Sequence, residues 1–350
     1  MTRRGWAGTA EGGRRFRECR VVNLAWAMGF VGALAALAWA GSLSAGGRLA
    51  LVVFFPYASA AVFAGGVILK VWAWARSAVP FRIPTTCGQQ RSLSWIRSSR
   101  LENPHDGIGV VLRMALEVLL FRSLFRNAGG EISSGGRIVY REAKALWLAA
   151  LAFHWSLLVI ILRHIRFFLY PVPGFVPALE RVDGIFELGM PAFLLSDAVV
   201  LAALAWLLLR RVLDPRLRYL SLFSDYLALS LLVGTAGTGI LLRYLAPVDL
   251  AAVKLWALGL AAFTPGAAPA GGLFFIHIAL VCALLAYFPF SKLMHAGGVF
   301  LSPTRNLANN SRMKRHVNPW NPAVRIHGYE EWESEFRDKI KAAGLPLERP

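Results

Sequence analysis

The chain has 350 residues, of which 56% are hydrophobic and 17% charged, whereas a soluble domain has about 25% charged residues. Its 38 Lys and Arg outnumber 20 Asp and Glu, but these basic residues lie between long apolar runs, which argues against a nucleic-acid-binding protein. Three widely spaced cysteines, Cys19, Cys87 and Cys282, exclude a disulfide framework and a cysteine-ligated zinc or iron–sulfur site within the chain.

Residues 1–75 predict an N-terminal tail and a two-helix membrane hairpin. A spanning helix needs about 20 mostly apolar residues, and the runs Val22–Ala40 and Leu49–Ala75 meet that length. The arginine-rich leader before the first run also fits a cleaved signal peptide. Because the run is as long as a full span and the second run returns the chain directly, we expect the first span to be retained.

Residues 76–144 predict a polar loop segment. Pro80 and Pro84 disfavour a helix near its start, whereas apolar residues at helical spacing predict an amphipathic helix over Gly109–Phe125. Such a helix either lies on acidic lipid or forms a docking surface for a cytoplasmic partner. The sequence does not separate these two interpretations.

Residues 145–295 predict a four-helix domain. Its four apolar runs are Ala145–Tyr170, Gly189–Val212, Leu222–Leu245 and Gly271–Met294. The weaker stretch Asp249–Phe263 is short for a crossing, and we interpret it as an interfacial helix. The predicted fold class is therefore an all-α integral membrane protein with six transmembrane helices, in which the last four form a bundle beside the N-terminal hairpin.

Residues 296–350 predict a cytoplasmic C-terminal tail with an amphipathic helix. Its apolar side chains recur at helical spacing at Tyr329, Trp332, Phe336 and Ile340. Acidic residues at its start and lysines at its end suit the helix dipole. The apolar stripe needs a cover, which is either a partner subunit or the long loop of this chain.

The distribution of Lys and Arg predicts the orientation of the chain in the membrane. With the N-terminus inside, 32 of the 38 basic residues lie on the inner side. The other six are Arg48, Arg163, Arg166, Arg181, Arg243 and Lys254. We therefore predict a multi-pass protein of the bacterial inner (cytoplasmic) membrane with both termini in the cytoplasm.

Four of the seven histidines lie on two predicted spans: His154 and His164 on the third, and His277 and His295 on the sixth. Ionisable residues at membrane depth are rare and usually functional. Because the two helices run in opposite directions, the helical rise pairs His154 with His295 near the inner surface and His164 with His277 further out. Pro289 predicts a bend in the sixth span.

Two histidine pairs on facing helices fit two b-type haems best. Catalytic zinc needs further ligands, and copper favours clustered His, Cys and Met. The small residues Gly234–Gly239 would let a flat macrocycle approach the fifth span, and they also suit close helix packing. His105, His316, His327 and Cys87 lie in polar segments and are assigned no cofactor.

Basic residues beside the two pairs are candidates for contacts with haem propionates or with lipid headgroups. On the outer side they are Arg163, Arg166 and Arg243, and on the inner side Lys292, Arg305 and Arg312.

The histidine spacing resembles that of the gamma subunits of respiratory nitrate reductase, which carry two histidines ten residues apart on one helix and two eighteen apart on a later one. The stretch Pro289–His295 is also similar to the motif around that family's last haem ligand. The resemblance covers about Ala145 to His295. It implies two haem b groups, the inner held by His154 and His295 and the outer by His164 and His277.

Three further segments resemble one branch of that family, the cytochrome b (DsrM) subunits of the sulfite-reductase-associated DsrMKJOP membrane complex. They are Arg82–Gln90, Glu117–Asn127 and Ser302–Asn310. The branch implies menaquinone or a related quinone as substrate and a cytoplasmic heterodisulfide-reductase-like iron–sulfur partner. It also implies other membrane and periplasmic redox subunits, with quinone near the outer haem.

Quinone chemistry needs a proton-exchanging group near the outer haem, and Asp197 on the fourth span is the candidate. Asp183 and Glu187 lie near the outer end of the same span. Asp197 alternatively hydrogen-bonds a neighbouring helix beside Ser196.

The expected function is electron transfer in a quinone-linked oxidoreductase complex. One alternative is a transporter or proton channel with a histidine relay, which favours broken spans, internal repeats and more buried carboxylates. Another is a haem-free membrane anchor for a redox enzyme, in which all four histidines are dispensable.

Overall fold

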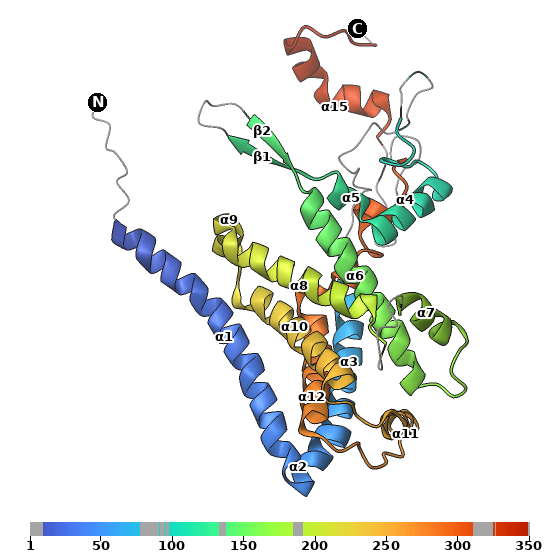
Figure 1. The fold of residues 1–350 in the computed structure, drawn as a ribbon. Helices are drawn as coiled ribbons and strands as arrows, with labels where there is room; N and C mark the ends of the chain where they lie inside the picture. The colour runs from blue at the N-terminus through green and yellow to red at the C-terminus, as the bar shows by residue number, and fades with distance from the viewer. Residues whose placement is uncertain are drawn as a thin grey trace.

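The computed structural model describes residues 10–77, 91, 95, 98–132, 138–184, 192–310, 325 and 327–348. Within these residues all elements of regular secondary structure are helices, except for one β-hairpin (Figure 1). Five helices are long and apolar enough to cross a membrane: Val22–Ser42, Ala45–Ala75, Lys144–Phe167, Phe223–Tyr244 and Gly272–Phe290.

The N-terminal hairpin forms as predicted. Its long helices are α1 (Ala10–Ser42) and α3 (Phe55–Ala75), which are joined by α2 (Ala45–Leu49) and the π-helix η1 (Ala50–Phe54). Ser44 caps α2 by accepting a hydrogen bond from the backbone N–H of Gly47. The helical segment Ala45–Ala75, which runs from α2 through η1 to α3, accounts for the whole second predicted span.

The fourth predicted span corresponds to α8 (Leu195–Leu213). This helix has 19 residues but carries Asp197, Arg210 and Arg211, and it is absent from the five described helices that meet the length and apolarity requirements. Residues 185–191, which include the start of the predicted span, lie outside the described residues. Composition alone therefore supports five crossings.

The helices after the polar loop pack in chain order. α6 (Lys144–His164) packs on α8, α8 packs on α10 (Phe223–Tyr244), and α10 packs on α12 (Gly272–Tyr287). The hairpin joins them at α12, because α1 lies along α10 and α12 and α3 lies along α12 (Figure 1). Ala27 of α1 is fully buried in a cluster with Tyr226, Leu231 and Leu280.

Short helices connect these long ones. η2 (Ile165–Phe167) and α7 (Phe175–Asp183) follow α6, and α9 (Pro215–Leu220) follows α8. The weak apolar stretch before the last span forms α11 (Leu250–Ala261), which Asp249 caps through the backbone N–H groups of Ala251 and Ala252. With 12 residues α11 is shorter than a crossing. Trp256 anchors it by donating its indole N–H to the carbonyl of Val52, at 3.0 Å.

The last span is interrupted where Pro289 predicts a bend. α12 ends at Tyr287 and is followed by the 3₁₀-helices η3 (Phe288–Phe290) and η4 (Lys292–Met294) and by α13 (His295–Gly298). Proline lacks the N–H that an α-helix interior requires. The expectation of one span reaching Met294 is thus corrected, and His295 begins a separate short helix.

The polar loop and the tail have their own structure. The loop forms α4 (Gly107–Leu120), α5 (Arg122–Phe125) and an antiparallel hairpin of β1 (Ala128–Ile132) and β2 (Ile138–Glu142), in which Ala128 pairs with Glu142 and Ile132 with Ile138. The all-α prediction missed this hairpin. The tail contains α14 (Pro303–Asn306), which packs on α4, and α15 (Tyr329–Ala342), where the amphipathic helix is predicted.

The helix predicted over Gly109–Phe125 is broken at Phe121. Phe121 adopts the left-handed conformation, with φ 50° and ψ 46°, and separates α4 from α5. A bulky residue with positive φ is uncommon and costs conformational free energy, so a contact of its side chain has to compensate.

Candidate haem site

The inner pair, His154 of α6 and His295 of α13, lies face to edge. The two ring centroids are 5.8 Å apart and the ring planes cross at 81°. Nδ1 of His154 is 2.7 Å from the carbonyl oxygen of Ala150, and Nδ1 of His295 is 2.6 Å from that of Lys292. Because a carbonyl oxygen only accepts, both Nδ1 atoms are the protonated donors and both Nε2 atoms keep a lone pair.

The outer pair consists of His164, the last residue of α6, and His277 of α12. Nδ1 of His164 donates to the carbonyl of Ile160, at 2.7 Å. Nδ1 of His277 is 2.9 Å from the hydroxyl oxygen of Thr238, whose own proton goes to the carbonyl of Gly234, at 2.8 Å. His277 is therefore the donor in this bond, and its Nε2 also keeps a lone pair.

This donor pattern fits haem ligation. A histidine that binds a metal almost always donates its other ring nitrogen to a neighbouring acceptor, which fixes the ring and raises its basicity. Two His–metal bonds of about 2 Å each would place two ring centroids roughly 6 Å apart across one ion, close to the 5.8 Å of the inner pair.

Each pair supplies only two protein ligands. The described part of the chain contains no group of three or more His, Cys, Asp or Glu residues able to hold a metal ion. A haem needs only axial ligands from the protein, because the macrocycle supplies the other four nitrogens. Paired histidines therefore suit haem better than a bare ion.

The face of α10 beside the outer pair carries little side-chain bulk. A Cβ at Gly239 would lie 3.2 Å from Cε1 of His277 and would press on the ring, whereas one at Gly237 would meet nothing within 4 Å. The buried hydroxyl of Thr235 has no hydrogen-bond partner among the described residues. A Cβ at Gly234 would lie 3.2 Å from Leu280, which suits close helix packing, and both roles of the run Gly234–Gly239 stay predictions.

The inner pair also contacts the polar loop. The ring of Phe121 packs edge-on against His154, with 4.9 Å between centroids, and Phe153 lies at the same centroid distance. The left-handed backbone conformation of Phe121 thus places its aromatic ring against His154. No sequence signal distinguished this phenylalanine from its apolar neighbours.

The predicted propionate contacts already have acidic partners. Arg163 is buried, with Asp197 at 2.6 Å and Asp183 at 3.4 Å. Lys292 lies 2.7 Å from the buried carboxylate of Asp225, which sequence reasoning missed because nothing in α10 marks which residue it faces.

Two further candidates share one acid. Arg166 pairs with Glu180, and Arg243 lies 3.9 Å from the same carboxylate. Arg305 lies in α14, and Arg312 is outside the described residues. Propionate contacts for these residues stay predictions.

Asp197 belongs to a buried polar network. Besides Arg163, it accepts a hydrogen bond from the hydroxyl of Tyr244, at 3.0 Å. Asp183 accepts two bonds from Ser196, at 2.8 Å from its N–H and 2.6 Å from its hydroxyl. The structure therefore shows Asp197 bonded to two neighbouring helices, to α6 through Arg163, which precedes His164 in the chain, and to α10 through Tyr244. Glu187 is outside the described residues.

The histidines outside the spans have different surroundings. His105 lies 3.2 Å from Arg91 and His327 lies 3.6 Å from Glu331. His316 and Cys87 are outside the described residues.

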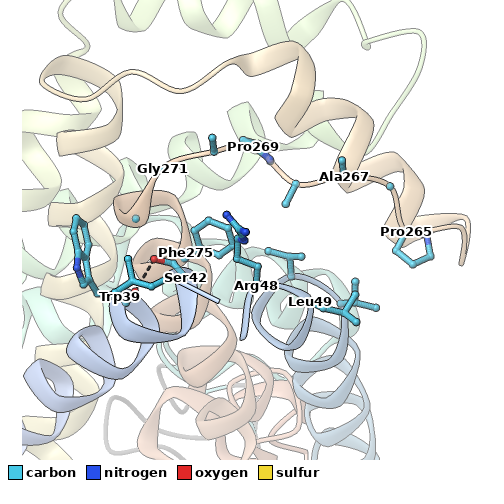
Figure 2. A pocket seen from close by; sticks show the side chains of 16 residues that line it. Trp39, Ser42, Arg48, Leu49, Pro265, Ala267, Pro269, Gly271 and Phe275 are labelled. Carbon is cyan, nitrogen blue, oxygen red and sulfur yellow. Dashed lines mark hydrogen bonds between the residues drawn. The ribbon is translucent and has the colours of Figure 1, made fainter. Parts of the chain in front are cut away.

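A pocket of about 560 Å³ lies at the turn of the hairpin, between α1 and α3 (Figure 2). It is bounded by the segment that follows α1 and by the segment that precedes α12, and the side chain of Arg48 turns toward it. Phe275 reaches its wall, but none of the four histidines lines it.

Comparison with known proteins supports the same cofactor class. Residues 113–316 match the nitrate reductase gamma subunit family, so all four histidines fall inside the match and α1 to α3 outside it. The chain is 44% identical over 279 residues to the Hdr-like menaquinol oxidoreductase cytochrome b-like subunit of Archaeoglobus fulgidus, covering 77% of this chain and 83% of that protein. The protein of the same name from Archaeoglobus profundus is 44% identical over 283 residues, covering 78% and 84%.

Proposed function

Because this chain belongs to the nitrate reductase gamma subunit family, we propose that it is a membrane di-haem cytochrome b that carries electrons between menaquinol and a cytoplasmic iron–sulfur partner. His154 and His295 hold the inner haem, and His164 and His277 hold the outer one. The observation that carries this proposal is that Nδ1 of each of the four rings lies 2.6 to 2.9 Å from a carbonyl or hydroxyl oxygen, an arrangement that leaves Nε2 for a ligand.

Hydrogen-bond acceptors within the chain hold and orient the four histidines that would bind the haems. A bound haem supplies one-electron transfer at its iron. The carbonyls of Ala150, Ile160 and Lys292 and the hydroxyl of Thr238 fix the four imidazole rings and increase their basicity. Asp197 accepts a proton from quinol on the outer side, either directly or through Tyr244, to which it is hydrogen-bonded.

The proposed topology has six crossings with both termini in the cytoplasm. The 32-to-6 division of basic residues supports this orientation. α8 crosses because its one acid at membrane depth, Asp197, is paired with Arg163, while Arg210 and Arg211 lie at its inner end. The proposed domains are the hairpin within residues 1–75, the loop 76–144, the haem domain 145–295 and the tail 296–350.

The proposed assembly is a DsrMKJOP-type complex of sulfur metabolism. The partner at the inner face is an iron–sulfur subunit of the heterodisulfide-reductase type, and the relatives' name, Hdr-like menaquinol oxidoreductase, supports this choice. The aromatic stripe of α15, with Tyr329 49% and Trp332 45% exposed, is a surface suited to such a partner.

Haem content tests the proposal directly. The purified chain should give a dithionite-reduced minus oxidised spectrum of b type, and pyridine haemochrome should report two haems per chain. Menaquinol should reduce both. Fewer than one haem b per chain in a well-folded preparation would contradict the proposal and favour a histidine-relay transporter or a haem-free anchor.

Thr238→Val should weaken the outer haem selectively. Valine keeps the size of threonine but removes the acceptor for Nδ1 of His277, and loss of such an outer-shell partner typically lowers metal affinity by about 10- to 100-fold. Haem retention during dilution and the redox titration of each haem are the measurements. Thr235→Val is the matched control, because its buried hydroxyl bonds no described residue. Equal effects of the two substitutions would exclude an orienting role for Thr238.

A further inference from the structure

One face of α4 carries only apolar side chains and is turned away from the rest of the protein. These residues, called the α4 stripe below, are Ile108, Val111, Leu112 and Leu119, which are 76%, 68%, 52% and 49% exposed. Their spacing places them on one side of the helix. An exposed apolar face of this kind marks an interaction with lipid or with protein.

The charged residues of α4 point the opposite way. Arg113 and Glu117 are buried, at 6% and 8% exposure. Arg113 donates to the carbonyl of Glu102, at 2.6 Å, and Glu117 accepts a hydrogen bond from the backbone N–H of Ser123, at 3.1 Å. A helix on a water-exposed surface shows the reverse arrangement, so α4 is suited to an apolar environment along its stripe.

The end of α4 is hydrogen-bonded to α6, a candidate spanning helix. The last carbonyls of a helix lack partners within the helix, and here the indole N–H of Trp147 donates to Leu120, at 2.7 Å, while that of Trp155 donates to Leu119, at 3.1 Å. Trp155 lies inside the candidate span Lys144–Phe167 and is 44% exposed. The stripe therefore adjoins an exposed surface of a candidate spanning helix.

Trp147 marks the depth of this contact. It lies near the start of the candidate span Lys144–Phe167. Tryptophan prefers the boundary between headgroups and acyl chains, so its bond to Leu120 places the end of α4 near that boundary.

We propose that α4 is an interfacial helix whose stripe inserts among the acyl chains of the leaflet next to the inner pair. The stripe carries no charge, the end of α4 bonds a candidate spanning helix, and its charged residues Arg113 and Glu117 are buried against the protein. This proposal does not depend on haem binding.

Spin labels on the full chain in liposomes test the proposal. In a background with Cys19 and Cys87 replaced by serine, a label at Val111→Cys should be accessible to oxygen and protected from a water-soluble nickel chelate. A label at Ile161→Cys, which is 54% exposed on α6, is the lipid control, and Asp338→Cys on α15 is the water control. Ile108→Cys provides a second position on the stripe should Val111→Cys fold poorly.

The outcomes separate the possible occupants. Accessibility like that of Ile161→Cys at both stripe positions supports insertion into lipid. Accessibility to nickel like that of Asp338→Cys overturns the proposal and indicates a docking face for a soluble subunit. Protection from both reagents also overturns it, because the stripe is then covered by protein.

Discussion

Replacing His295 by alanine is expected to remove the inner haem and to leave the outer haem in place. His295 begins its own short helix, and its ring faces His154 at 5.8 Å, whereas the outer pair lies on α6 and α12. With one axial ligand lost, pyridine haemochrome should fall from two haems per chain to one. The remaining haem should titrate at nearly its original potential.

His327→Ala is the matched control, since His327 is an exposed histidine of the tail whose described partner is Glu331. It should retain both haems. Equal loss of both haems in His295→Ala, with unchanged helix content by circular dichroism, would contradict the assignment of two separate pairs.

Asp197→Ala is expected to destabilise the protein strongly. Asp197 and Arg163 form a buried ion pair at 2.6 Å, with side chains only 8% and 10% exposed. Removing one member of such a pair leaves an uncompensated buried charge, which typically costs about 3–5 kcal/mol. We expect the lower end of that range, because Asp183 remains 3.4 Å from Arg163. Chemical unfolding in mixed micelles measures the loss.

A triple variant separates stability from proton chemistry at Asp197. Arg163→Met combined with Asp197→Leu and Asp183→Asn removes all three buried charges, so that Asp183, which lies 3.4 Å from Arg163, is not left unpaired. It should recover most of the lost stability, as replacement of buried ion pairs by apolar residues often does. If Asp197 also accepts a proton from quinol, menaquinol oxidation stays slow in the stable triple variant. Recovery of the wild-type rate would exclude a proton role and leave a structural one.

The spanning helices were predictable because hydropathy is a local property. The runs Val22–Ala40 and Leu222–Leu245 correspond to described helices within a few residues. α8 was harder, since the charge of Asp197 lowers apolarity while its partner Arg163 comes from another helix. A hydropathy value for α8 includes the charge of Asp197 but not its pairing with Arg163.

The depth of each histidine along its helix could be predicted from the sequence, but the residues around it could not. The rise per residue is enough to set His154 opposite His295, and the structure brings these two rings together. Which acid faces Lys292 depends instead on the rotation of α10 about its axis, so Asp225 carried no signal in the sequence. The left-handed Phe121 and the β-hairpin are also set by tertiary contacts, which override local propensity.

Because of the break at Pro289, His295 is held by a different part of the structure from the two histidines of the outer pair. His164 and His277 lie in the long helices α6 and α12, so moving either one requires a shift of that helix against its packed neighbours. His295 instead belongs to the segment that leads to Asn309, which hydrogen-bonds Asn103 and the carbonyl of Pro104 in the loop. A displacement of this loop is therefore transmitted to His295 without a shift of α6 or α12.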